Sequence, residues 1–189
     1  NPSHQSFVQD VKHYRAAGIL GVDTESRNAV ATIFINLYIR ARLLWNPDED
    51  VDALLADFYP RFYGPAAEPM SEYWNAIFKA WAQTIVTEHE YFVAPAIYTP
   101  ELMGFLQNKL EEAERLINRL KVTGRPLKPS EQMLLQRMEF TRIGFEILDA
   151  YMQMVRAAAT EVDYAAAVAA GERGLKARDA MTNLGGMFT

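Results

Sequence analysis

Apolar residues recur at intervals of three and four along most of the chain, which is the spacing of one face of an α-helix. The pattern runs through residues 29–45, 51–62, 70–85, 102–120 and 134–159. The pattern is interrupted at Asn46-Pro47 and at Tyr63-Gly64-Pro65, and each of these segments favours a turn. The chain is therefore predicted to be mainly α.

Details of this pattern predict how the helices begin, end and pair. The helix from Met70 is expected to reach about Glu90, and residues 91–98, which include Pro95, are expected to form an extended connector. Thr99-Pro100 is expected to start the next helix. The regular face of residues 134–159 predicts antiparallel pairing with that preceding helix, and the alanine-rich residues 163–183 predict a closely packed last helix.

One short segment departs from the helical pattern. Ile19-Leu20-Gly21-Val22 is a brief apolar run, and the polar residues 23–28 follow it. This arrangement is typical of a strand that leads into a loop. The predicted fold is a helical bundle of long antiparallel helices, with one short strand near the N-terminus. A single strand between two helices is also the repeating step of a β/α barrel, so this strand is a candidate barrel strand.

Composition narrows the classes of partner. The 189 residues are 50% hydrophobic, which is enough for one substantial core, and the absence of cysteine excludes disulfides. The net charge is −5 and no basic cluster occurs, so nucleic acid is not an expected partner. No apolar run approaches the ~20 residues of a membrane span, so no membrane partner is expected. Because the chain starts at Asn1 without an initiator Met, it is expected to be a fragment or a processed product.

Metal and nucleophile motifs are missing from the sequence. The only histidines are His4, His13 and His89, and none follows a Glu at the three-residue spacing of di-iron bundles. No Gly-x-Ser-x-Gly elbow or glycine-rich phosphate loop occurs. No metal and no cofactor are therefore expected, and the acids at residues 48–52 are interpreted as favourable charges at a helix start rather than as a cation site.

Two carboxylates remain as candidates for catalysis. Asp23 and Glu25 follow the predicted strand and precede a helix, which in a β/α barrel is the catalytic rim. A pair of carboxylates can perform the acid–base chemistry of glycoside hydrolysis. The alternative is that both residues merely cap the following helix.

The stretch around residues 37–73 resembles a known family. The residues that carry the resemblance are Leu37-Tyr38, residues 41–47, residues 50–54, Phe58, residues 62–70 and Tyr73. The family is bacterial, uncharacterised and glycoside-hydrolase-like, is commonly described only as a domain of unknown function, and is similar to α-glucuronidases and hexosaminidases. The match covers roughly residues 5–90 and fades into generic helices afterwards.

The resemblance implies a β/α barrel followed by a helical C-terminal region. Residues 1–45 would be the last helix-strand-helix step of the barrel, and residues 46–189 the helical domain. Glu25 and Asp23 would lie at the catalytic face, and Trp45 and Tyr63 are the candidate substrate-binding residues. The partners implied are the remainder of the barrel and, through the parent protein, a carbohydrate.

Activity and location follow from the same resemblance. One strand cannot close an eight-stranded barrel, so this chain alone is expected to be inactive although its parent is a candidate glycoside hydrolase. A secreted or periplasmic location in a bacterium fits the family, but the sequence itself leaves the location open.

Two other functions stay open at this stage. The chain can be a stand-alone helical interaction module that forms a homodimer through the face of residues 134–159. It can also be a small-ligand-binding bundle, for which a cavity lined by Trp45, Trp74 and Trp81 would be evidence.

Overall fold

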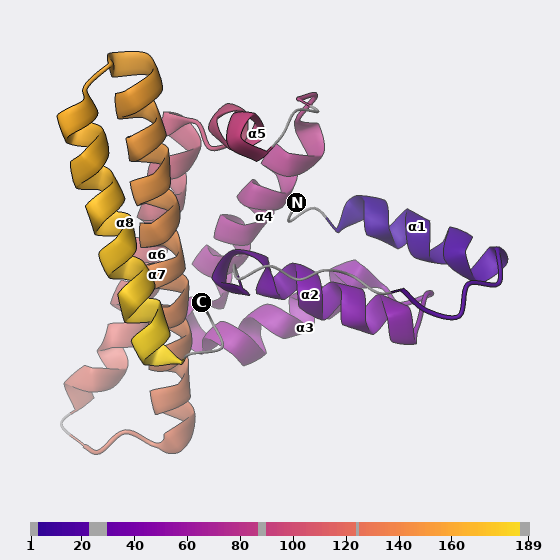
Figure 1. The fold of residues 1–189 in the computed structure, drawn as a ribbon. Helices are drawn as coiled ribbons and strands as arrows, with labels where there is room; N and C mark the ends of the chain where they lie inside the picture. Colours follow the sequence, from indigo (N-terminus) through magenta and orange to yellow (C-terminus); the bar gives the residue numbers. More distant parts are fainter. Residues whose placement is uncertain (1–3, 23–29, 87–89, 124, 186–189) are drawn as a thin grey trace.

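The computed structural model describes residues 4–22, 30–86, 90–123 and 125–185 (Figure 1). These residues are mainly α, as predicted, and within the described ranges no strand occurs and no helix is long and apolar enough to cross a membrane. The α-helices are α1 (Gln5–Ala16), α2 (Val30–Trp45), α3 (Val51–Tyr63), α4 (Ala67–Gln83), α5 (Glu90–Ile97), α6 (Pro100–Asn118), α7 (Pro129–Arg156) and α8 (Tyr164–Leu184). Shorter helical turns are η1 (Gly64–Ala66), η2 (Arg119–Thr123) and the π-helical η3 (Ala157–Glu161).

The long helices α6, α7 and α8 lie side by side at one side of the molecule (Figure 1). Helices α1, α2 and α3 extend to the opposite side, and α4 lies between the two groups, against α3 and α6. Helix α7 contacts α2, α3, α6 and α8, so it joins the two sides of the bundle.

The strand predicted at Ile19–Val22 does not form. These residues have no regular secondary structure, and Leu20 is fully exposed. Left-handed Gly18 (φ 74°) turns the chain out of α1, and no described segment offers a strand edge for residues 19–22 to pair with. A strand needs such a neighbour to satisfy its backbone, so the apolar run alone was not sufficient.

The boundary between α4 and α5 also differs from the prediction. Helix α4 ends at Gln83 rather than near Glu90. The backbone of Thr84 is extended, and the Ile85 side chain is exposed to solvent. Residues 91–98 were predicted as an extended connector, but Glu90–Ile97 form α5 with Pro95 inside it. Val93 and Ile97 lie four residues apart and are both buried, so packing of this face outweighs the hydrogen bond that proline removes.

Helix α7 contacts the preceding helix α6, as predicted, but it packs more extensively on α8. Small residues explain the difference. A Cβ atom at Gly174 would lie 3.3 Å from the Ala150 Cβ, so the backbones of α7 and α8 approach closely there. The prediction of a tight, alanine-rich last helix is confirmed, and its start is capped by Asp163, whose side chain accepts from Ala166 N.

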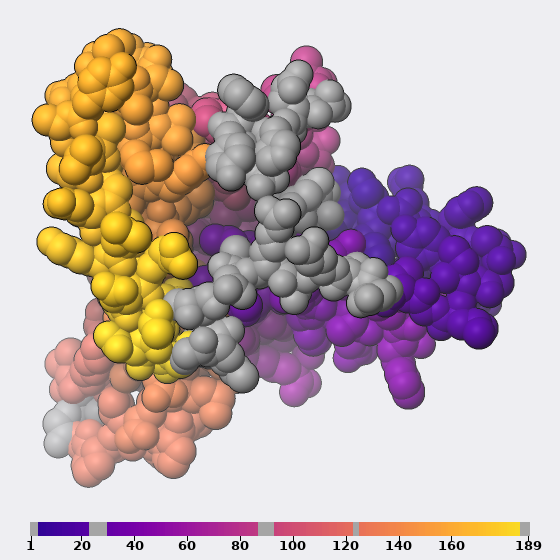
Figure 2. Space-filling view, in the orientation of Figure 1, coloured from indigo at the N-terminus to yellow at the C-terminus, as the bar shows by residue number. Residues whose placement is uncertain are grey.

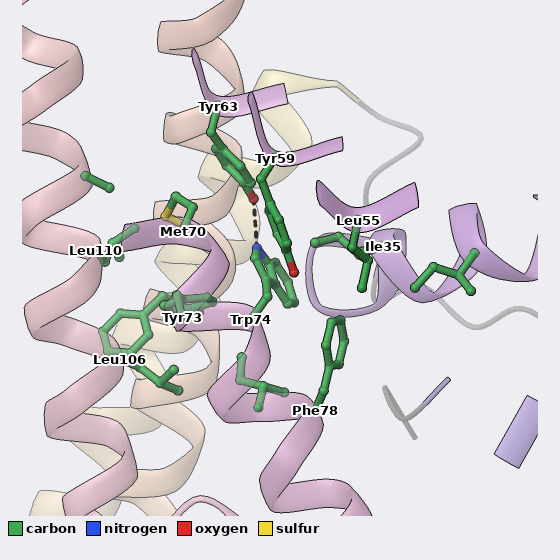
Figure 3. Close-up of a cluster of buried hydrophobic side chains, with 14 of the residues drawn as sticks. Ile35, Leu55, Tyr59, Tyr63, Met70, Tyr73, Trp74, Phe78, Leu106 and Leu110 are labelled. Atoms are coloured by element: carbon green, nitrogen blue, oxygen red, sulfur yellow. Dashed lines mark hydrogen bonds between the residues drawn. The ribbon is translucent and has the colours of Figure 1, made fainter. Parts of the chain in front are cut away.

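The core is rich in aromatic side chains from α3 and α4 (Figure 3). Tyr63, Tyr73, Trp74 and Phe78 are buried together, and Trp81, one turn further along α4, is partly buried against them. The same apolar cluster includes side chains on both sides of the proposed boundary at residues 45 and 46. The division into residues 1–45 and 46–189 stays a prediction.

Candidate functional site

The residues predicted to act on a substrate do not come together in the structure. Asp23 and Glu25 lie outside the described residues. Trp45 is the last residue of α2 and is 91% exposed, whereas Tyr63 is the last residue of α3 and is fully buried. Trp45 precedes the turn that leads into α3, whereas Tyr63 ends that 13-residue helix, so the two side chains belong to different environments.

Tyr63 belongs to a buried chain of hydrogen bonds. Trp74 Nε1 donates to the Tyr63 hydroxyl at 2.9 Å, as Figure 3 shows, and that hydroxyl lies 3.1 Å from Thr141 Oγ1. Thr141 Oγ1 donates to the Arg137 carbonyl at 3.0 Å, so the Tyr63 hydroxyl is the donor to Thr141. Burial raises the pKa of Tyr63, which keeps it neutral. Its hydroxyl therefore has a structural role, and a sugar would reach it only if the core opened.

Leu44, the residue before Trp45, belongs to an exposed apolar area that we call the N-terminal surface. It comprises Ile19, Leu20, Val22 and Leu44, with exposed fractions from 36% for Val22 to 105% for Leu20. A groove of about 250 Å³ runs along it between the end of α1, residues 18–22 and the end of α2. Such a grouping of large apolar side chains on a surface is typical of a binding face.

Polar contacts fix the helix ends next to the N-terminal surface. Arg15 and Asp48 form an exposed ion pair at 2.6 Å that links the end of α1 to the turn before α3. Asp50 caps α3 by accepting from Asp52 N and Ala53 N at 3.0 and 3.1 Å. The interpretation of residues 48–52 as a helix start is confirmed for Asp50. Among the described residues, no group of three or more metal-binding side chains gathers.

The histidines play different parts. His4 is buried with its ring edge-on to Phe78, 4.9 Å between centroids. Its burial lowers the pKa of the imidazole, an effect opposed by the negative charge of Asp52. His13 lies on α1, and His89 is outside the described residues.

Sequence reasoning missed a charged cleft of about 450 Å³ between α6 and α7. At its centre Arg142 donates to Glu139 at 3.0 and 2.6 Å and also to Glu146. Glu114, from α6, comes only to 3.9 Å of Arg142, too far for a hydrogen bond. Burial raises the pKa of Glu114, whereas the bond from Arg142 lowers the pKa of Glu139. The spacing of Glu139, Arg142 and Glu146 was visible in the sequence, but the approach of Glu114 was not.

A second missed cavity, of about 480 Å³, is apolar. It lies between α2, α3 and α7, with Leu184 at the end of α8, and we call it the aromatic groove. Phe34 and Phe62 stack at 5.1 Å between centroids, and Phe140 meets Phe34 edge-on at 5.5 Å. In the part of the chain that the structure describes, none of the three tryptophans lines either of these cavities or the groove of the N-terminal surface, so these three cavities do not support the alternative of a ligand-binding bundle.

Comparison with curated proteins and with solved structures returned no match. A family model matches residues 1–75, which end within α4 and include all the residues from Leu37 to Tyr73 that carry the resemblance. The N-terminal part of the chain is therefore similar to a domain of unknown function, DUF4838.

Proposed function

We propose that this chain is the C-terminal part of a carbohydrate-active, glycoside-hydrolase-like protein. In this proposal, residues 1–45 complete a β/α barrel whose remainder covers the N-terminal surface, and residues 46–189 form a helical domain beside it. The chain's own role is structural, and the parent protein carries the activity.

The observation that carries the proposal is the unpartnered N-terminal surface. Ile19, Leu20 and Val22 are exposed on a segment without secondary structure, between α1 and α2. The order helix, apolar segment, helix is that of one step of a β/α barrel, in which both faces of each strand are covered. A neighbouring strand would satisfy the backbone of residues 20–22 and remove these side chains from water.

The predicted roles of Asp23 and Glu25 follow from this placement. Carboxylates that directly follow a barrel strand project from the catalytic face, where an acid and a base or nucleophile are needed for glycoside cleavage. The exposed indole of Trp45 is the described residue best able to stack on a sugar ring.

The catalytic part is tested in the full-length protein with a panel of aryl glycosides. Asp23→Asn and Glu25→Gln should each lower kcat by about a hundredfold or more. Asp179→Asn, an exposed carboxylate on α8, is the control and should leave turnover unchanged. Unchanged kinetics in both rim variants would reject the site, and a native gene product no longer than this chain would reject the barrel.

The docking part has its own test. Leu20→Asp should destabilise the full-length protein, because it places a charge where the remainder of the barrel is proposed to pack. Ile85→Asp is the matched control, since Ile85 is 92% exposed and lies away from this surface. Equal melting temperatures for the two variants would contradict the proposal.

The alternative of a homodimer needs a different face from the one predicted. Met138, Phe145 and Met152, on the regular face of residues 134–159, are buried in the chain's own core. Figure 2 shows α8 along the edge of the molecule, and its Tyr164, Val168 and Leu175 are 68%, 62% and 59% exposed. A monomer at high concentration in sedimentation experiments would exclude the dimer.

A further inference from the structure

The aromatic groove and the charged cleft adjoin each other. Gln136 and Leu184 line both cavities, so the two open on either side of these residues at the N-terminal half of α7. Their volumes, about 480 and 450 Å³, are each in the range of small-molecule sites. One ligand can therefore place one end in each cavity.

The aromatic groove suits an uncharged, apolar group. Its walls include Phe34, Phe62 and Phe140, and Met133 is 47% exposed beside them. The one cation among its lining residues is already used: Arg137 lies over the Phe62 ring at 4.5 Å and donates to the Arg61 and Phe62 carbonyls at 2.9 and 3.3 Å. Among the described residues that line the groove, an anionic group would therefore find no unused cation.

The charged cleft has the opposite character. The single guanidinium of Arg142 faces three carboxylates, those of Glu114, Glu139 and Glu146. Glu139 and Glu146 take its hydrogen bonds, which leaves the half-buried Glu114 with only a weak attraction at 3.9 Å. Lys121, at the rim, is exposed and offsets part of this charge. A group that brings a positive charge and hydrogen-bond donors to Glu114 complements this cleft.

We propose that the joined cavities bind a small amphipathic amine, with its aromatic or branched apolar body in the aromatic groove and its ammonium group on Glu114. A bare metal ion fits less well, because no set of three metal ligands gathers among the described residues. The inference does not rest on the glycoside-hydrolase proposal, since it uses neither the N-terminal surface nor Asp23 and Glu25.

The experiment titrates the chain with 4-phenylbutylamine, 4-phenylbutanol and 4-phenylbutyrate, by calorimetry and by NMR with assigned backbone amides. The amine should bind at least about tenfold more tightly than the alcohol, and the acid should bind least. Amide shifts should concentrate at residues 133–142 and around Glu114. Binding of all three with equal affinity, shifts elsewhere, or no amine binding at about 10 mM would overturn the proposal.

Two variants separate the ionic contact from general damage. Glu114→Gln should weaken the amine about tenfold and leave the alcohol unchanged, because only the amine uses the charge. Glu172→Gln, an exposed carboxylate on α8 outside both cavities, should change neither. Equal effects of the two variants on the amine would contradict the assignment, and circular dichroism confirms that each variant is folded.

Discussion

Gly144 is the point where α7 comes closest to α2, and adding one methyl group there tests this packing. A Cβ atom at residue 144 would lie 2.8 Å from the Ala31 Cβ and 3.5 Å from the Ala31 carbonyl oxygen. Unbonded carbon atoms prefer about 3.5–4.0 Å, so α2 would have to shift by roughly 0.7 Å or more. Ala31 has no flexible side chain that can move aside instead.

The size of the effect follows from two opposing contributions. Overpacking a close contact costs about 1–3 kcal/mol, whereas replacing a mid-helix glycine by alanine gains about 1 kcal/mol. A Cβ atom added at Gly104, on the exposed side of α6, would meet no atom within 4 Å, so Gly104→Ala should show the gain alone. Gly144→Ala should therefore be less stable than Gly104→Ala by about 1–3 kcal/mol.

Urea unfolding followed by tryptophan fluorescence measures this difference, and a melting curve should shift by about 2–4 °C per kcal/mol. Adding Ala31→Gly to Gly144→Ala removes the clashing Cβ and should recover a coupling energy of about 1–3 kcal/mol in a double-mutant cycle. If Gly144→Ala is as stable as Gly104→Ala and the cycle shows no coupling, α2 and α7 do not approach as closely at Gly144 as the structure indicates.

Three further predictions concern other parts of the fold. Tyr63→Phe should lower the unfolding free energy by about 1–3 kcal/mol, because it leaves Trp74 Nε1 buried without an acceptor. Tyr59→Phe should leave the unfolding free energy unchanged, since the Tyr59 hydroxyl has no hydrogen-bond partner among the described residues. Equal losses in the two variants would refute this reasoning. Val162→Gly should stabilise the chain by about 0.5–1 kcal/mol in urea unfolding, because Val162 holds a left-handed φ of 56° and its side chain is 62% exposed. A loss of stability would show that the Val162 side chain makes a contact that outweighs its backbone strain. Burial lowers the pKa of His4 below its ordinary value of 6.5, so the unfolded chain binds the proton more readily than the folded chain. The stability that neutral His4 contributes should be present above pH 6.5 and decline as the pH falls through the lowered pKa of the folded state. His4→Leu should flatten that decline in unfolding free energy measured against pH.

Local signals in the sequence account for much of the helical framework. The unbroken apolar spacing of residues 30–45 is enough for α2, and Thr99-Pro100 marks the start of α6, where the Thr99 hydroxyl accepts from Leu102 N. Gly64 at φ 55° ends α3 where the turn was predicted. These features depend on residues within one or two turns of each other, so they can be predicted without the rest of the chain.

Other features depended on packing between distant segments. Val93 and Ile97 keep α5 helical in spite of Pro95 because they are buried, and Ile19–Val22 forms no strand because no described neighbour pairs with it. The sequence likewise does not distinguish Trp45 from Tyr63 as a surface aromatic, yet one is exposed and the other is in the core.

The sequence by itself determined that the chain is mainly α and where most helices begin, because those choices are made by neighbouring residues. Only the tertiary structure decided that α7 packs more extensively on α8 than on α6, since the close approach at Gly174 and Ala150 involves residues 24 positions apart. It also brought Glu114 of α6 toward Arg142 of α7, which neither helix's own pattern reveals. Cavities and their charge arise from such meetings of separate helices, and for that reason they become visible only in the folded chain.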